Sequence, residues 1–124
     1  MAEEQHSWYH GSPHVISVLR KGIIVTHWAD LAAAMSLKPA IMVLSDDGRK
    51  IRHNGQGRGF LYEIVDPVEE EKDLEPLESP LGEGLEWRTK KPFRVDLVCN
   101  TMPRPEDILK PEEIEEFRKR EGSE

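Results

Sequence analysis

Apolar and polar positions along this chain mostly alternate in short runs that end at turn residues, which is the pattern of half-buried strands. Strands are expected at residues 7–11, 23–27 and 60–65, and one or more further strands at 87–99. The continuous apolar run at 40–44 has strand length, although a helical turn has the same pattern. A turn at 45–48 and a returning segment at 49–53 would make this run one arm of a hairpin.

Three segments have the pattern of helices. Residues 13–20 place Ser12 as an N-cap and Pro13 at the first helical position, and Lys21-Gly22 follows. Residues 30–36 are rich in alanine, the strongest helix former. Residues 111–120 begin with a proline, have acidic residues in the first turn and end in basic ones, which suits the helix dipole.

Residues 68–85 combine many acidic residues with two prolines, two glycines and few apolar positions, which predicts a long acidic loop. Short strands and few helices, without regular strand–helix alternation, predict an α+β fold and argue against a doubly wound nucleotide-binding fold. The 124 residues suit one domain, 1–124, with its core within about 7–100.

Composition narrows the classes of function. A net charge of −7 makes nucleic acid an unlikely partner. No apolar run reaches the roughly 18 residues of a membrane helix, and the acidic N-terminus is unlike a signal peptide. Cys99 is the only cysteine, so an internal disulfide is impossible and a cytoplasmic setting is favoured. In its apolar run, Cys99 is expected to be a small core residue.

Charge is unevenly distributed. One basic island, Arg49, Lys50, Arg52 and Arg58, surrounds His53, and a second comprises Arg88, Lys90, Lys91 and Arg94. A dinucleotide diphosphate needs only one or two cations, so either island would suffice, although each also fits an ordinary solvated hairpin end. Arg58 is the candidate cation for binding the diphosphate.

The candidate chemistry begins at residues 8–13, Trp-Tyr-His-Gly-Ser-Pro. A histidine at a strand end beside a glycine and a hydroxyl residue can form a ligand-binding corner, since glycine lets a flat ring approach the backbone and serine both donates and accepts hydrogen bonds. A plain strand-to-helix transition explains Ser12 and Pro13 equally well, but leaves His10 and Gly11 without a role. Other signatures are absent: there is no G-x-G-x-x-G and no P-loop, and Pro13 interrupts any single helix that could hold His6, His10 and His14 on one zinc ion.

Three segments resemble the ADP-ribosyltransferase superfamily. Tyr9-His10-Gly11-Ser12, followed by Lys21-Gly22-Ile23, resembles the superfamily's opening His-Gly-Ser/Thr corner. Residues 58–67 (RGFLYEIVDP) resemble the central strand of the small rifamycin-modifying members, and residues 86–95 (EWRTKKPFRV) resemble a later strand of theirs. The same stretch resembles the Glu-aromatic start of the strand that carries the catalytic glutamate in the poly-ADP-ribosylating branch. The resemblance spans about residues 8–99.

The resemblance implies two small, roughly perpendicular, antiparallel-rich sheets with an NAD cleft between them. His10 would hydrogen-bond the nicotinamide ribose, the Gly11 backbone would receive the nicotinamide amide, and Ser12 would touch either group. Glu86 would be the catalytic carboxylate that stabilises an oxocarbenium-like transition state, with Glu83 as a nearby rival.

One departure from the family pattern concerns the ring that stacks on nicotinamide. The family usually offers a tyrosine at the end of a strand before an alanine-bearing helix, whereas Thr26 stands at the simplest alignment here and cannot stack. His27 or Trp28 could supply the flat face instead. Phe60 and Tyr62 share a face of a regular strand and are expected to be core residues.

The expected function is NAD-dependent ADP-ribosyl transfer to a small molecule or macromolecule, with His10 and Glu86 as catalytic residues. The residues expected to bind NAD are His10, Gly11, Ser12, Thr26, His27, Trp28 and Arg58. Two alternatives stay open. The missing tyrosine favours a non-catalytic module that binds NAD or ADP-ribose, and the shared opening favours an RNA 2′-phosphotransferase, which would need several arginines at its site.

Overall fold

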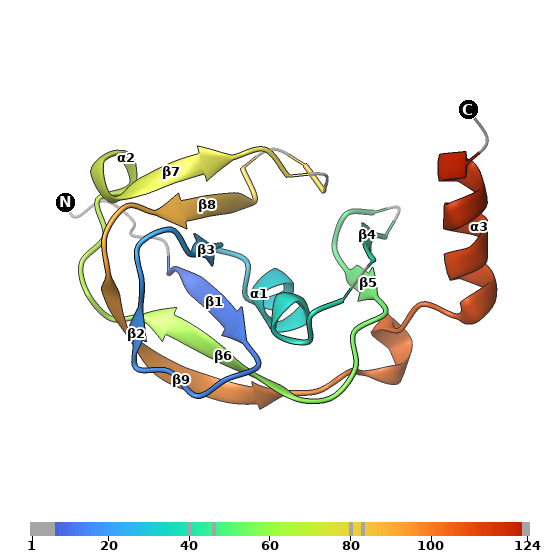
Figure 1. Cartoon of the computed structure of the whole chain (residues 1–124), viewed down its shortest axis with the longest axis horizontal. Helices are drawn as coiled ribbons and strands as arrows, with labels where there is room; N and C mark the ends of the chain where they lie inside the picture. The colour runs from blue at the N-terminus through green and yellow to red at the C-terminus, as the bar shows by residue number, and fades with distance from the viewer. Residues whose placement is uncertain (1–6, 40, 46, 80, 83, 123–124) are drawn as a thin grey trace.

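The computed structural model describes residues 7–39, 41–45, 47–79, 81–82 and 84–122, with the side chains of 117–122 excluded. Its strands form three antiparallel sheets, accompanied by a few short helices (Figure 1). The expected α+β class is therefore confirmed. Ala40 and the rival carboxylate Glu83 lie outside the described residues.

The largest sheet has the order β1-β6-β9-β2, formed by Tyr9–Ser12, Gly59–Ile64, Phe93–Thr101 and Val18–Leu19. The second has the order β3-β8-β7, formed by Ile24–Val25, Glu86–Thr89 and Leu74–Leu77. The third is the hairpin of β4 and β5, Met42–Leu44 and Ile51–His53. The helices are α1 (Ala29–Ser36), α2 (Glu70–Asp73), the 3₁₀ helix η1 (Pro105–Asp107) and α3 (Pro111–Gly122).

The first two sheets meet where β1 passes the end of β3. The Tyr9 N–H donates to the Thr26 carbonyl at 2.7 Å, and the Thr26 N–H donates back to the Tyr9 carbonyl at 3.0 Å. The main apolar core contains residues of both sheets, and its buried members are Trp8, Leu19, Val25, Tyr62, Ile64, Leu74, Trp87, Phe93 and Val95. Phe60 packs against this core, so the expectation that Phe60 and Tyr62 are core residues is confirmed.

Helix α1 covers the other face of the four-stranded sheet, and Gly11 permits the contact. A Cβ added at Gly11 would lie 1.8 Å from the Ala32 carbonyl oxygen and 2.7 Å from the Ser36 nitrogen. Helix and strand backbones therefore touch, which only glycine allows. A second apolar cluster follows on the far side of α1, where Leu31 and Ala34 pack with Ile51 of the hairpin.

The helix predicted at 13–20 is wrong. The Ser12 hydroxyl accepts the His14 N–H at 3.0 Å in a local turn, so it does not cap a helix. The buried Tyr62 hydroxyl accepts the Ile16 N–H and donates to the His14 carbonyl, each at 2.9 Å. The chain then forms β2, in which Val18 lies opposite Arg94. Tertiary hydrogen bonds thus replace the helical ones in a segment rich in β-branched residues.

The acidic segment 68–85 was predicted as one loop, and this is wrong for its first half. Residues 70–73 form α2, and β7 follows at the free edge of the second sheet. An edge position tolerates Pro76, whose missing N–H breaks no ladder there. Asp73 is buried, accepts the Glu69 N–H and pairs with Lys91 at 3.5 Å.

The prediction that Cys99 is a core residue is also wrong, since its side chain is exposed. β9 continues to Thr101, two residues beyond the predicted strand region 87–99. The helices predicted at 30–36 and 111–120 are confirmed as α1 and α3.

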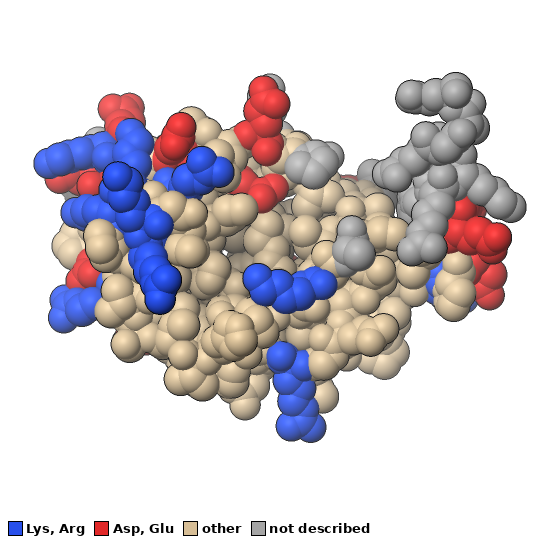
Figure 2. Space-filling model, in the orientation of Figure 1, with Lys and Arg blue, Asp and Glu red and all other residues tan. Residues whose placement is uncertain are grey.

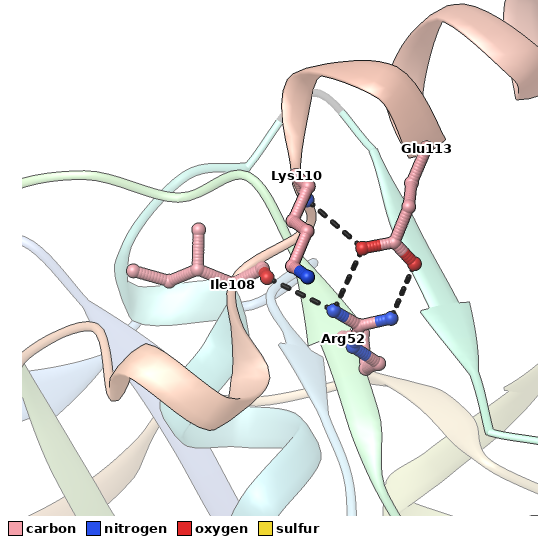
Figure 3. A network of polar contacts seen from close by, with 4 residues as sticks. All are labelled: Arg52, Ile108, Lys110 and Glu113. Atoms are coloured by element: carbon pink, nitrogen blue, oxygen red, sulfur yellow. Dashed lines mark hydrogen bonds and ion pairs between the residues drawn. The ribbon is translucent and has the colours of Figure 1, made fainter.

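Helix α3 lies at one end of the molecule and is tied to β5 by an ion pair (Figures 1 and 3). Both Arg52 terminal nitrogens donate to the Glu113 carboxylate, at 2.5 and 2.9 Å, and one also donates to the Ile108 carbonyl at 3.1 Å. The Lys110 N–H donates to the same carboxylate at 3.1 Å. Such a two-pronged contact fixes orientation as well as attracting charge. None of the described helices has the length and apolarity needed to cross a membrane.

Replacing Gly11 with alanine should destabilise the fold strongly, because the new Cβ collides with helix backbone that cannot move independently. The expected loss in the free energy of unfolding is about 3 kcal/mol or more, at or above the upper range for overpacking. Gly48→Ala is the matched control. Gly48 has φ +70° and open space at its Cβ, so it should lose only about 1 kcal/mol to left-handed strain. Urea denaturation measures both, and equal losses would contradict the proposed role of Gly11.

Candidate functional site

His10 lies on β1 at the junction of the two sheets, with its ring oriented by β3. Its Nδ1 is 2.8 Å from the Ile24 carbonyl oxygen. A carbonyl can only accept, so Nδ1 carries a proton and donates it. In the neutral ring Nε2 is then an acceptor with no partner among the described residues. Such a nitrogen can accept a hydrogen bond from a hydroxyl or amide group of a ligand.

His10 is kept in this neutral form by its surroundings. Burial lowers the pKa of His10 below its ordinary value, the Ile24 carbonyl opposes this by favouring the protonated ring, and the charge of Lys38 lowers the pKa further. Lys38 follows α1 with φ of +50°. No local pattern identifies Lys38 as a site residue, because only the packing of α1 against β1 brings it near His10. Its exposed ammonium group could receive an anion.

Glu86 lies two strands away from β1 in the second sheet. The register of β3 and β8 places Val25 opposite Trp87, and one further step places Thr26 opposite Glu86. Since Tyr9 also pairs with Thr26, the backbones at Tyr9 and Glu86 are two strand spacings apart, about 10 Å. Trp87 is a core residue, so alternation directs Glu86 to the outer face of this sheet. The Glu86 side chain is half-buried and has no hydrogen bond or ion pair with other described residues.

The three candidates for a nicotinamide-stacking face are engaged in the fold. Thr26 is buried, and its hydroxyl accepts the Trp28 N–H at 3.1 Å. His27 is exposed, and its ring packs against Trp8 and Trp87 with centroid separations of 5.8 and 5.1 Å. Trp28 packs against the second apolar cluster beside α1. The bridge between Tyr9 and Thr26 brings this segment beside the His10 corner, but none of the three residues presents an unengaged ring.

The remaining predicted residues divide into two groups. Gly11 and Ser12 adjoin His10, but Gly11 is covered by α1 and Ser12 makes a local turn, which accounts for both without a ligand. Arg58 lies elsewhere. His10 is opposite Tyr62 on β6, and Arg58 is four residues from Tyr62, about 13 Å along an extended chain. That distance exceeds the reach of the Arg58 side chain.

Part of the charge in the basic islands is neutralised locally. Basic side chains gather at the left of Figure 2, over β2 and the β8–β9 connection, with acidic ones above them. Arg94 pairs with Asp66 at 2.8 Å and Lys91 pairs with Asp73. In the first island, Arg52 is held by Glu113. The other cations of the two islands have no ion pair with described residues.

A cavity of about 690 Å³ lies apart from the His10 corner, between α1, β5, the end of β9 and η1. Sequence reasoning singled out Arg49, Lys50 and His53 from its wall, as a basic island, but missed the contribution of residues 99–107. No signal in the sequence joins these segments. The described residues contain no group of three or more His, Cys, Asp or Glu side chains that could hold a metal ion.

Acid should destabilise the protein between pH 7 and 5, because burial lowers the pKa of both His10 and His53 in the folded state. In the unfolded chain both histidines bind protons near their ordinary pKa of 6.5. Their contribution to the free energy of unfolding is therefore fully present above pH 6.5, and it is lost as pH falls toward the lowered pKa values of the folded state. Urea unfolding at pH 7 and pH 5 measures this loss.

The double variant His10→Asn/His53→Asn is the control, since asparagine can replace the Nδ1 contacts of both rings without titrating. It should lose less stability over this interval than the wild type. Equal pH dependence in the two proteins would contradict the inferred neutral rings. Carboxylates with lowered pKa values, such as Asp66 and Glu113, act at lower pH and do not disturb the comparison.

Comparison of the chain with models of known protein families, with curated proteins and with solved structures gives no significant match. Its function is therefore inferred from its own residues and their arrangement.

Proposed function

We propose that the protein is an NAD-dependent ADP-ribosyltransferase, with the nicotinamide end of NAD at the His10 corner. The observation that carries the proposal is the state of the His10 ring. Nδ1 is fixed on the Ile24 carbonyl, burial favours the neutral form, and Nε2 is left as an acceptor. A ribose hydroxyl is a suitable donor for that nitrogen.

The contacts between the resembling segments support the same proposal. Residues 9–12, 58–67 and 86–95 are far apart in sequence, yet β1 pairs with β6, β6 pairs with β9, and β8 joins β1 through β3. Sheet pairing thus gathers into one region the segments that resemble the superfamily.

Transfer of ADP-ribose breaks the bond between nicotinamide and ribose, and positive charge develops on the ribose as it breaks. A carboxylate near that position stabilises the transition state more than the ground state. Glu86 is proposed for this role, because it begins β8 and its carboxylate has no competing ion pair among the described residues. Lys38 is proposed to face the diphosphate in place of Arg58, since it lies beside His10.

A non-catalytic module that binds NAD or ADP-ribose is the second candidate. One observation favours it: Thr26, His27 and Trp28 are all engaged in the fold, so a stacking ring for nicotinamide has to be released from other contacts. An RNA 2′-phosphotransferase has less support, because that chemistry needs several arginines at the site. Arg94 is paired with Asp66, and Arg58 precedes β6, far from the Tyr62 position that is opposite His10.

NAD binding should depend on His10 Nε2. His10→Ala removes the ring, while His10→Asn keeps a donor for the Ile24 carbonyl and deletes only the outer acceptor. Both variants should fold and bind NAD about tenfold more weakly by calorimetry, which corresponds to roughly 1.4 kcal/mol, the scale of one hydrogen bond. Lys50→Ala is the control. It removes an exposed cation at the cavity that lies apart from the His10 corner, so it should leave NAD affinity unchanged. Wild-type affinity in folded His10→Asn would refute the assignment of His10.

Nicotinamide release should depend on the charge of Glu86. Glu86→Gln keeps the shape and removes the charge, so it should lower turnover at least ~100-fold while NAD affinity changes by a few fold at most. Glu75→Gln, on the adjacent strand opposite Arg88, should be nearly silent. Glu83→Gln tests the rival carboxylate: a large effect there with none at Glu86 would transfer the role to Glu83. If the wild type binds NAD but releases no nicotinamide, the binding module is the correct function.

A further inference from the structure

The 690 Å³ cavity lies on the opposite face of the four-stranded sheet from His10. Leu61 and Cys99 line it, and both are in register with Gly11, whose face is covered by α1. His10 is opposite Tyr62, which faces the core between the sheets. Residues directly opposite in register share a face, so the cavity and the His10 corner are on different sides.

The cavity has the size of a small-molecule site and a largely apolar wall. On one side α1 contributes Ala33, Ala34 and Leu37, and facing them are Ile51 of β5 and Leu61 of β6. Short alanine side chains leave a flat surface along the helix. Such a wall suits a planar apolar body.

His53 adds a buried donor to this wall. The side chain is only 4% exposed, and its Nδ1 accepts the Gly55 N–H at 3.0 Å. The proton of the neutral ring is therefore on Nε2, which has no partner among the described residues. Among the described residues, every side-chain nitrogen or oxygen that is fully shielded from solvent has a hydrogen-bond partner. Since Nε2 has none, it is not fully shielded and borders accessible space. Since His53 lines the cavity, that space is the cavity.

The position of His53 is fixed by its neighbours. The His53 carbonyl accepts the Leu109 N–H at 2.8 Å, and Arg52 binds Ile108 and Glu113 (Figure 3). β5 is thereby joined to the segment after η1 on both sides of His53. A donor held in this way is preorganised for a ligand.

Charge at the cavity is divided between two edges. Arg104 lies on one edge, where it donates to Asp107 at 2.7 Å and also has the charges of Asp30 and Glu106 nearby. On the other edge Arg49 and Lys50 are exposed and have no ion pair with other described residues. The nearest described carboxylate there is that of Asp47, which accepts the Ser45 hydroxyl and the Arg49 N–H and has the charge of Lys50 nearby, so the two cations outnumber it. The available positive charge is therefore at the β5 edge.

Two of these features are aligned by alternation along β5. Ile51 and His53 are two residues apart on the strand and share a face. Arg49, in the bend before β5, lines the same cavity. This wall thus offers a cation, an apolar surface and a hydrogen-bond donor in chain order, so a ligand that matches it has an anionic group at one end and an acceptor at the other.

We propose that this cavity is a second binding site, specific for a planar aromatic acid that carries a hydrogen-bond acceptor at the end opposite its carboxylate. The carboxylate binds Arg49 and Lys50, the ring packs between Ile51 and α1, and the far acceptor receives the His53 Nε2–H. The site does not depend on the NAD-binding proposal, because it lies on the other face of the sheet.

Three probes of one shape test the site at pH 7.5: 6-hydroxy-2-naphthoate, 2-naphthoate and 2-naphthylmethanol. Amide shifts in ¹H–¹⁵N spectra of the full chain locate binding, and titration gives each dissociation constant. The two acids should shift the amides of Ile51, His53 and Leu61 saturably. 2-Naphthoate should bind at least fivefold more tightly than the neutral alcohol, and the hydroxy acid a further threefold more tightly.

Variants then assign each end of the probe. Arg49→Ala/Lys50→Ala alters only exposed side chains and should abolish the preference of 2-naphthoate over the alcohol. Arg88→Ala/Lys90→Ala, which removes two exposed cations of the second basic island, should preserve it. His53→Asn keeps an acceptor for the Gly55 N–H and should remove only the advantage of the hydroxyl group.

Three results would overturn the proposal: no saturable shift at the cavity amides, equal binding of acid and alcohol by the wild type, or loss of the preference in the Arg88/Lys90 control. Saturating NAD should not displace 2-naphthoate, and competitive displacement would refute the independence of the two sites. Binding of the acids by a protein that does not bind NAD would reject the proposed function alone and leave this site established.

Discussion

The contact between Gly11 and α1 is the constraint on which the rest of the arrangement depends. A strand and a helix normally stay apart by the thickness of their side chains, but here the Gly11 backbone lies against Ala32 and Ser36. Gly59 on β6, one register position beyond the end of β1, makes a similar contact with Ser36. Two glycines on one face of the sheet therefore seat the helix, and alanines on the helix complete the fit.

This close seating separates the molecule into two halves, each with one of the two proposed sites. On the face of β1 and β6 opposite α1, Tyr62 and Trp8 join the core that both sheets share, and His10 lies at its margin. On the other side of α1, the hairpin packs through Ile51 on Leu31 and Ala34 and leaves the cavity beside His53. Each half contains one histidine with an unengaged nitrogen, an acceptor at the half-buried His10 and a donor at the buried His53. The opposite tautomers follow from what each Nδ1 contacts, a carbonyl in one case and an N–H in the other.

The two histidines also illustrate how burial can serve binding. Charging either ring in an apolar setting is costly, so both have lowered pKa values and stay neutral at neutral pH. A neutral imidazole with one nitrogen fixed by the fold has a defined donor or acceptor at the other. The protein thus obtains two directional hydrogen-bonding groups without burying a charge.

Local signals in the sequence were reliable where the element depends on local energetics. The alanine run of α1, the capped charge pattern of α3 and the alternation of β6 are each set by neighbours within a few residues, and the helices and strand formed as expected. The same signals failed at 13–20, where Ser12 and Pro13 imitate a helix start. There Tyr62, more than forty residues away, provides the hydrogen bonds that decide the conformation. β7 was missed for a similar reason, because Leu74–Leu77 becomes a strand only by pairing with β8.

By itself the sequence determined the fold class, the position of most strands and the residue types of the His10 corner, since these follow from periodicity and from a short contiguous motif. It could not determine which cation lies beside His10, because Lys38 arrives there only through the packing of α1. Nor could it reveal that Cys99 is exposed, because this depends on the cavity that α1 leaves open on that face of β9. The cavity was equally invisible, as its wall joins α1, β5, β9 and η1. Proximity between distant segments is set by sheet pairing and by the close contact of α1 with Gly11 and Gly59, and the local pattern of residues predicts neither.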